Sequence, residues 1–152
     1  TADIIERIDG RVEWIINRTG RTPALVGWSL GGIYAREYAK RHPDKVARVV
    51  TLGSPFSGSR RANRAWRLYY LVARHPVDRP PIDFHPAPRP AVPTFALWST
   101  RDGVVAAASA RGLPHESDHQ VEVDCSHMGF AYAPASVAAI VGALAEKICA
   151  SA

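Results

Sequence analysis

The chain has 152 residues, of which 47% are apolar and 22% charged, and its 19 Lys and Arg outnumber 14 Asp and Glu to give a net charge of +5. This composition is typical of a globular domain and excludes a disordered chain, a collagen-like chain and a coiled coil. No apolar run approaches the roughly 20 residues that a membrane-spanning helix needs.

The first half of the chain predicts two helices around a short strand. Apolar residues recur at helical spacing over 3–18, and Gly20 stands where a helix is expected to end. The apolar run 24–27 is too short for a helix and fits a buried strand. A second helical pattern covers 30–41 and ends at His42, because the residue before a proline is pushed out of the helical region.

The middle of the chain predicts a strand at 46–52 followed by an insert at 57–91. Arginines alternate with Trp66, Tyr69 and Tyr70 in the first part of the insert, and five prolines fall between Pro80 and Pro90. We interpret the insert as a short basic amphipathic helix followed by an extended connector. An ordinary helix packed on the core is slightly favoured over a lid that binds an anionic lipid surface.

The last third predicts two more strands, at 92–99 and 120–123, and a final helix that begins at Pro134 and runs through Ile148. Strands that alternate with helices form a parallel sheet with helices on both faces. The sequence therefore predicts an α/β fold in a single domain over 1–152.

A glycine-flanked serine marks the junction between the first strand and the second helix. The segment reads Gly27-Trp28-Ser29-Leu30-Gly31, followed by Gly32. A serine on a sharp strand-to-helix turn has its hydroxyl exposed, and the turn is expected to require small residues two positions before and after it. The N–H of Leu30 and the helix N-terminus are placed to stabilise an oxyanion. Gly32 is expected to let the helix pack closely on the strand.

A serine nucleophile needs a base, and the base needs an orienting acid. Asp102 follows the strand at 92–99, although an aspartate before Gly103 can also simply bond its own turn. Of six histidines, His127 alone lies after the fourth strand and before the last helix; the others are His42, His75, His85, His115 and His119. The order Ser29, Asp102, His127 matches one of the known orders of this triad.

These motifs resemble the α/β-hydrolase superfamily, most closely its bacterial lipase and esterase branch. The resemblance covers the elbow at 27–32, the helix after it, the strand end at 51–55, the acid loop at 99–105 and the histidine loop at 126–129. It implies Ser29 as nucleophile, Asp102 as acid and His127 as base, with Leu30, Trp28 and Met128 at the oxyanion and substrate site. It also implies carboxylic esters as substrates, either small molecules or lipids, and no cofactor or metal.

The chain departs from that superfamily ahead of the elbow. The superfamily normally has four strands there and a loop that supplies a second oxyanion N–H, whereas one helix precedes the elbow here and no His-Gly pair occurs. The pattern therefore resembles the C-terminal half of a hydrolase with an open sheet edge, which is a liability for pairing or aggregation. We expect either a fragment or a chain whose edge is covered by another copy or another chain.

The sequence is also compatible with other functions and sites. The alternative function is a weak or inactive half-domain that binds a lipid surface or a protein partner through the basic insert. Nucleic-acid binding is disfavoured, because the aromatic spacing does not suit a stacking platform. Asp118 and Asp124 could hold calcium but are more often surface residues. The sequence does not decide between hydrolysis and acyl transfer.

The two cysteines, Cys125 and Cys149, are too few for a disulfide framework and lack the spacing of a metal site. We interpret them as two buried thiols, with a disulfide possible if the fold brings them together. The first residues lack the pattern of a secretory signal peptide. The compartment is open, with the cytoplasm slightly favoured.

Overall fold

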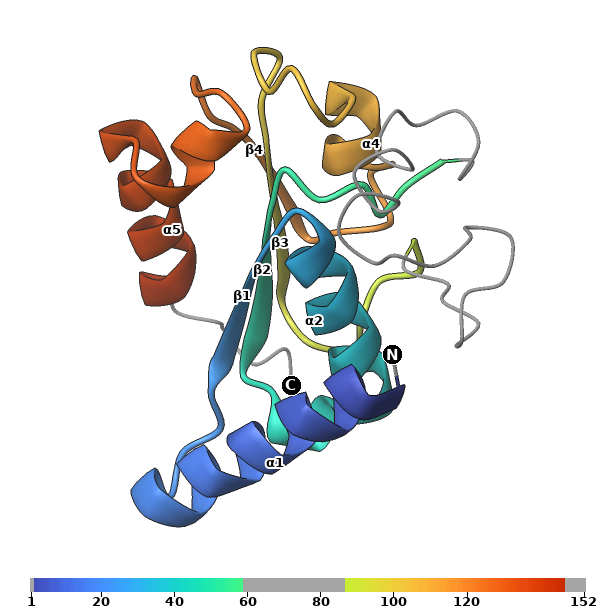
Figure 1. Ribbon diagram of the computed structural model, residues 1–152, viewed down its shortest axis with the longest axis vertical. Helices are drawn as coiled ribbons and strands as arrows, with labels where there is room; N and C mark the ends of the chain where they lie inside the picture. Colours follow the sequence, from blue (N-terminus) through green and yellow to red (C-terminus); the bar gives the residue numbers. More distant parts are fainter. Residues whose placement is uncertain (1, 59–86, 147–152) are drawn as a thin grey trace.

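The computed structural model describes residues 2–58 and 87–146, and it contains a four-stranded sheet with helices on both faces (Figure 1). The strands are β1 (Ala24–Trp28), β2 (Arg48–Leu52), β3 (Thr94–Trp98) and β4 (His119–Glu122). The sheet order is β1-β2-β3-β4, and every neighbouring pair is parallel. The predicted α/β fold and its four strands are confirmed.

The helices match the sequence pattern where the pattern is long. They are α1 (Ala2–Thr19), α2 (Leu30–Arg41) and α5 (Pro134–Ala145), with a short α4 (Ala107–Arg111) and two 3₁₀ turns, η1 (Pro43–Lys45) and η2 (Met128–Ala131). Gly20 ends α1 with a positive φ of 67°, and its N–H donates to the Ile16 carbonyl. The five residues of α4 were not predicted, because so short a helix shows no periodicity.

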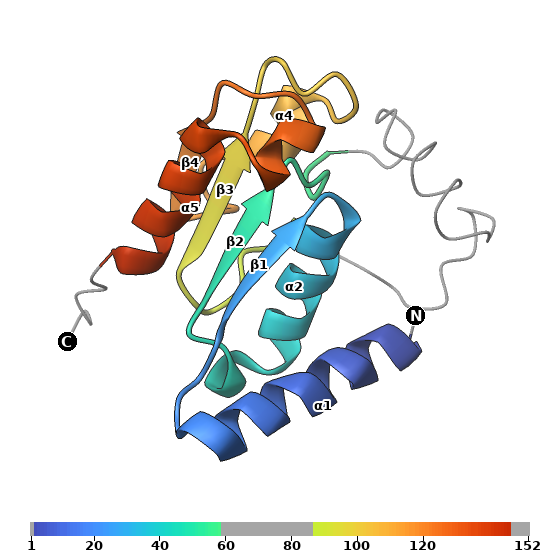
Figure 2. The same cartoon turned by 60° about the vertical axis from the view of Figure 1, so that its left-hand side comes forward.

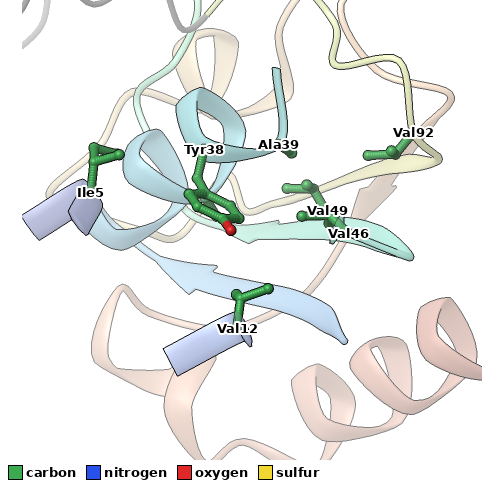
Figure 3. Close-up of a cluster of buried hydrophobic side chains, with 8 residues drawn as sticks. Ile5, Val12, Tyr38, Ala39, Val46, Val49 and Val92 are labelled. Carbon is green, nitrogen blue, oxygen red and sulfur yellow. The ribbon is translucent and has the colours of Figure 1, made fainter. Parts of the chain in front are cut away.

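Two apolar layers hold the sheet between its helices. On one face, α2 packs against β1 and β2 while α1 packs against α2, with Tyr38 fully buried between Ile5, Val12 and Val49 (Figure 3). On the other face, α5 covers a cluster that includes Leu52, Leu97 and Phe130. Figure 1 shows α2 and α5 on opposite sides of the sheet. Alternate residues of β2 therefore enter different layers, as expected for a strand buried on both faces.

The carboxyl ends of the strands meet at one edge, which is the upper end in Figure 2. The elbow, the acid loop and the histidine loop all follow strands at this edge, where open parallel sheets place their ligand sites. Most of the basic insert, and Cys149, lie outside the described residues. No described helix combines the length and apolar character needed to cross a membrane.

Candidate active site

Ser29 lies on a strained turn between β1 and α2. Its φ of 53° and ψ of −122° make it the one non-glycine residue with positive φ in the described part of the chain. The Ser29 N–H donates to the Leu52 carbonyl at 2.8 Å, which continues the β1–β2 pairing into the turn. Such a conformation costs about 1–3 kcal/mol and persists only where the surroundings fix it. The turn therefore has the backbone of the predicted nucleophile elbow.

The glycines of the elbow have different tasks. A Cβ on Gly27 would lie 2.5 Å from the Gly31 carbonyl oxygen, and one on Gly32 would overlap Ser54 Oγ. A Cβ on Gly32 would also lie 2.9 Å from the Gly27 carbonyl oxygen, so Gly32 lets α2 pack closely on the end of β1, as predicted, and on the segment after β2. The expectation for Gly31 was wrong, because a Cβ there would meet nothing within 4 Å beyond its own helix turn. Gly31 lies on the exposed side of the first turn of α2.

Asp102 serves its own turn and reaches His127 at the same time. One carboxylate oxygen, Oδ1, accepts hydrogen bonds from the N–H groups of Val104 at 2.9 Å and Val105 at 2.6 Å. The other, Oδ2, lies 2.8 Å from His127 Nδ1. The turn therefore fixes one carboxylate oxygen of Asp102, as the turn interpretation predicts, and leaves the other in contact with the imidazole.

His127 is held by both its ring and its main chain. Asp102 and His127 are 4% and 5% exposed, so their contact is shielded from water. The His127 N–H donates to the Asp102 carbonyl at 3.0 Å, and the His127 carbonyl accepts from the Trp28 indole N–H at 3.1 Å. A carboxylate can only accept, so it favours the tautomer with the proton on Nδ1 and leaves Nε2 as the basic atom.

The serine hydroxyl is not joined to this pair. Ser29 Oγ is buried and makes no hydrogen bond with any residue that the structure describes. The structure therefore brings Asp102 and His127 into direct contact and places Ser29 on its elbow at the same edge of the sheet.

The remaining predicted site residues are sequence neighbours of Ser29 and His127. Leu30 is the first residue of α2, so its N–H has no partner within the helix. Trp28 precedes the serine, and the exposed Met128 follows the histidine.

The other described histidines lie in different settings, away from Asp102. His42 lies beside Tyr38 with ring centroids 4.7 Å apart, and His119 stacks on Phe95. His115 lies in the segment before β4, whereas His75 and His85 fall outside the described residues.

Gly53 is a site residue that the sequence did not reveal. It follows β2 with a φ of 51°, and a Cβ there would lie 2.7 Å from Asp102 Oδ2 and 2.7 Å from the Phe130 ring. Because Gly53 has no side chain, the Asp102 carboxylate and the Phe130 ring can approach the end of β2. The sequence does contain one indication, because Gly53 directly follows β2, the neighbour of the strand β3 that precedes Asp102.

Cys125 lies buried behind the acid loop. Burial raises the pKa of its thiol, and the charge of Asp102 acts in the same direction. A buried cysteine whose thiol pKa is raised is typical of a structural residue, in contrast to the reactive cysteines whose pKa is lowered.

The two aspartates considered for calcium are engaged elsewhere. Asp118 accepts from the Thr94 N–H and pairs with Arg89, while Asp124 pairs with Arg101 at the surface. Within 2–58 and 87–146, no group of three or more His, Cys, Asp or Glu side chains is arranged to hold a metal ion.

Comparison with known proteins identifies the architecture. Residues 3–74 match the family model described as alpha/beta hydrolase fold. A monoacylglycerol lipase from Paleococcus ferrophilus superposes with a TM-score of 0.58 at 20% identity, covering 90% of this chain and 73% of that one. A hydrolase from Pseudomonas aeruginosa gives 0.60 at 15% identity, covering 93% and 72%. The chain has the α/β-hydrolase fold.

Curated relatives of this α/β-hydrolase-fold chain match it over shorter segments. The pimeloyl-[acyl-carrier protein] methyl ester esterase of Shewanella woodyi is 37% identical over 59 residues, which is 39% of this chain. The protein of the same name from Aromatoleum aromaticum is 52% identical over 42 residues, or 27% of this chain. These matches span 23% and 17% of the relatives' own lengths.

Proposed function

We propose that the chain is a serine ester hydrolase that acts through Ser29, His127 and Asp102. The observation that carries the proposal is the buried 2.8 Å contact between Asp102 Oδ2 and His127 Nδ1, at the edge of the sheet where Ser29 occupies a positive-φ elbow. Ser29 is the nucleophile, His127 the base and Asp102 the group that orients the base.

The proposed reaction has two balanced halves. Ser29 Oγ attacks the ester carbonyl carbon while its proton passes to His127 Nε2, and the Leu30 N–H stabilises the oxyanion. The tetrahedral intermediate collapses, the alcohol leaves with the proton from His127, and Ser29 is acylated. Water then attacks the acyl carbon and gives a proton to Nε2. The bond to Ser29 Oγ breaks, Nε2 returns the proton to Oγ, and the carboxylic acid is released with free Ser29.

Exposed apolar side chains flank each of the three residues. Trp28 precedes Ser29, Val104 lies two residues after Asp102, and Met128 follows His127, and all three are exposed. This setting suits an ester with an apolar acyl or alcohol group. The two curated relatives are named as methyl ester esterases, which supports a carboxylic ester as the substrate class.

Active-site labelling tests this proposal. A fluorophosphonate probe should label the folded chain at one site, because a serine activated by His127 attacks phosphorus as it attacks an ester. Ser29→Ala should abolish labelling and the hydrolysis of p-nitrophenyl butyrate. Gel fluorescence of the probe and release of p-nitrophenol are the two measurements.

A matched control removes a different hydroxyl. Thr100→Ala deletes an exposed hydroxyl within the acid loop that bonds Glu122 and takes no part in the Asp102–His127 contact, so it should label like the unaltered chain. Absence of labelling in folded protein, or equal labelling of Ser29→Ala, would rule out the proposal.

A further inference from the structure

The serine and the histidine follow the two outer strands of the described sheet, although both lie at the carboxyl ends of the strands. Ser29 follows β1 and His127 follows β4, and two strands lie between them in the order β1-β2-β3-β4. The histidine loop must therefore cross the ends of β2 and β3 to approach the elbow. The position of the histidine loop relative to the elbow therefore depends on contacts between the loops.

The histidine loop has a separate contact with each of the other two parts of the site. Asp102 holds the His127 N–H and ring, which ties the histidine to the end of β3. The link to the elbow comes from Trp28, whose indole Nε1 donates to the His127 carbonyl at 3.1 Å. The Trp28 and His127 rings also lie 5.5 Å apart between centroids, tilted by 37°.

Trp28 is well suited to transmit position. It is the last residue of β1 and lies in register with Leu52 of β2, so the β1–β2 pairing fixes its backbone. Ser29 is its immediate neighbour and continues that pairing through the Leu52 carbonyl. The side chain of Trp28, the residue before Ser29, thus contacts the main chain of His127.

We propose that Trp28 is a positioning residue that sets the place of His127 relative to Ser29, through its indole hydrogen bond to the His127 carbonyl and its ring contact with the imidazole. This inference rests on the proposed serine hydrolase function. It gives Trp28 a role in aligning His127, beyond the substrate contact that the sequence implied.

The first test separates the indole N–H from the aromatic ring. Trp28→Phe keeps an aromatic ring and removes the donor. Loss of one hydrogen bond of this kind corresponds to about a threefold to tenfold change. We expect the rate of fluorophosphonate labelling, and kcat for p-nitrophenyl butyrate, to fall by about that factor with KM within twofold, because the loss affects the alignment of the base.

Trp14→Phe is the matched control. Trp14 lies on α1, is exposed and stacks with Arg11, and α1 lies near the end of the sheet opposite to the site (Figure 2). The same chemical change there should leave kcat, KM and labelling as they are. The unfolding midpoints of both variants establish that each is folded.

A second test does not depend on activity. Hydrogen–deuterium exchange, read by mass spectrometry on peptides covering 124–130, reports how firmly the histidine loop is held. We expect Trp28→Phe to exchange faster there by about threefold or more, with peptides of α1 unchanged, since one hydrogen bond to the loop is lost. Trp14→Phe should match the unaltered chain over 124–130.

The outcomes distinguish the two proposals. Exchange over 124–130 that is unchanged in Trp28→Phe, or an unchanged labelling rate, overturns the positioning role. A raised KM with unchanged kcat also overturns it and assigns Trp28 to substrate contact. Faster exchange in Trp28→Phe, in a chain that Ser29-directed probes do not label, supports the positioning of the loop while the hydrolase proposal fails.

Discussion

At the scale of single residues, two positions with positive φ lie within the candidate site. Ser29 has positive φ, and so does Gly53, which lies against the Asp102 carboxylate. The two positions are linked through β2, because Ser29 bonds the carbonyl of Leu52, the residue before Gly53. A change at Gly53 should therefore reach the acid directly.

Gly53→Ala should displace Asp102 and weaken the site. The new Cβ would lie 2.7 Å from Asp102 Oδ2 and the Phe130 ring, in addition to the strain of alanine at positive φ. We expect a loss of about 1–3 kcal/mol in the free energy of unfolding. Labelling of Ser29 should also fall by about tenfold or more, because misplaced catalytic groups lose rate steeply.

The control for this prediction has the same backbone strain without the steric contact. Gly20→Ala also places alanine at positive φ, but its Cβ would meet nothing within 4 Å. Denaturation curves and probe labelling are compared for both variants. A Gly53→Ala protein that labels as fast as Gly20→Ala would show that the end of β2 does not constrain the acid.

At the scale of elements, polar contacts add to the apolar packing of α1 on α2. The Tyr38 hydroxyl donates to Asp9 Oδ1 at 2.7 Å, and Lys45 Nζ reaches the same oxygen at 2.9 Å. The Tyr38 hydrogen bond, and then Lys45, lower the pKa of Asp9 below 3.8. Burial, and then the bond to Asp9, raise the pKa of Tyr38 above 10.0.

These shifts predict how the docking of α1 depends on pH. The lowered pKa of Asp9 contributes stability that is present above pH 3.8 and is lost as the pH falls through its folded value. The raised pKa of Tyr38 contributes stability that is present below pH 10.0 and is lost at higher pH. Docking should therefore be most stable between these values.

Tyr38→Phe tests this at the acid end. It removes the largest cause of the Asp9 shift, so the loss of stability between pH 7 and pH 3 should be smaller than in the unaltered chain. Urea unfolding followed by circular dichroism at both pH values measures the difference. Tyr132→Phe, at an exposed tyrosine, is the control and should behave like the unaltered chain. An equal acid response in Tyr38→Phe would contradict the assignment.

At the scale of the whole molecule, β1 is an edge of the described sheet and its α5-side face is open. Val26 and Trp28 are in register with Val50 and Leu52, which belong to the cluster under α5, yet Val26 is 44% exposed. Val137, Val141 and Leu144 of α5 are exposed as well. An open strand edge with apolar side chains beside it favours pairing with another chain.

We expect the chain to self-associate at micromolar concentration through this edge and face. Val26→Lys should reduce the association, because a charged side chain on an edge strand disfavours pairing. Multi-angle light scattering over a concentration series measures the mass. Leu113→Lys introduces the same charge at an exposed site outside the sheet and should leave the mass unchanged. A monodisperse monomer of the unaltered chain would contradict the prediction.

Much of this protein was determined by its sequence because the signals are local. Helical periodicity located α1, α2 and α5, short apolar runs located the strands, and the spacing of Gly27 and Ser29 located the elbow. Each signal depends on residues within one element, where backbone preferences and side-chain direction act directly.

The sequence paired Asp102 with His127 as acid and base, but which atoms of the loops meet was decided by tertiary structure. The meeting of Asp102 with His127, of Trp28 with the His127 carbonyl, and of Gly53 with the acid joins segments far apart along the chain. They exist because parallel strands bring their carboxyl ends to one edge in the order β1 to β4. The spacing of residues in the sequence does not determine which loop atoms face each other there. The packing of the sheet determines these contacts.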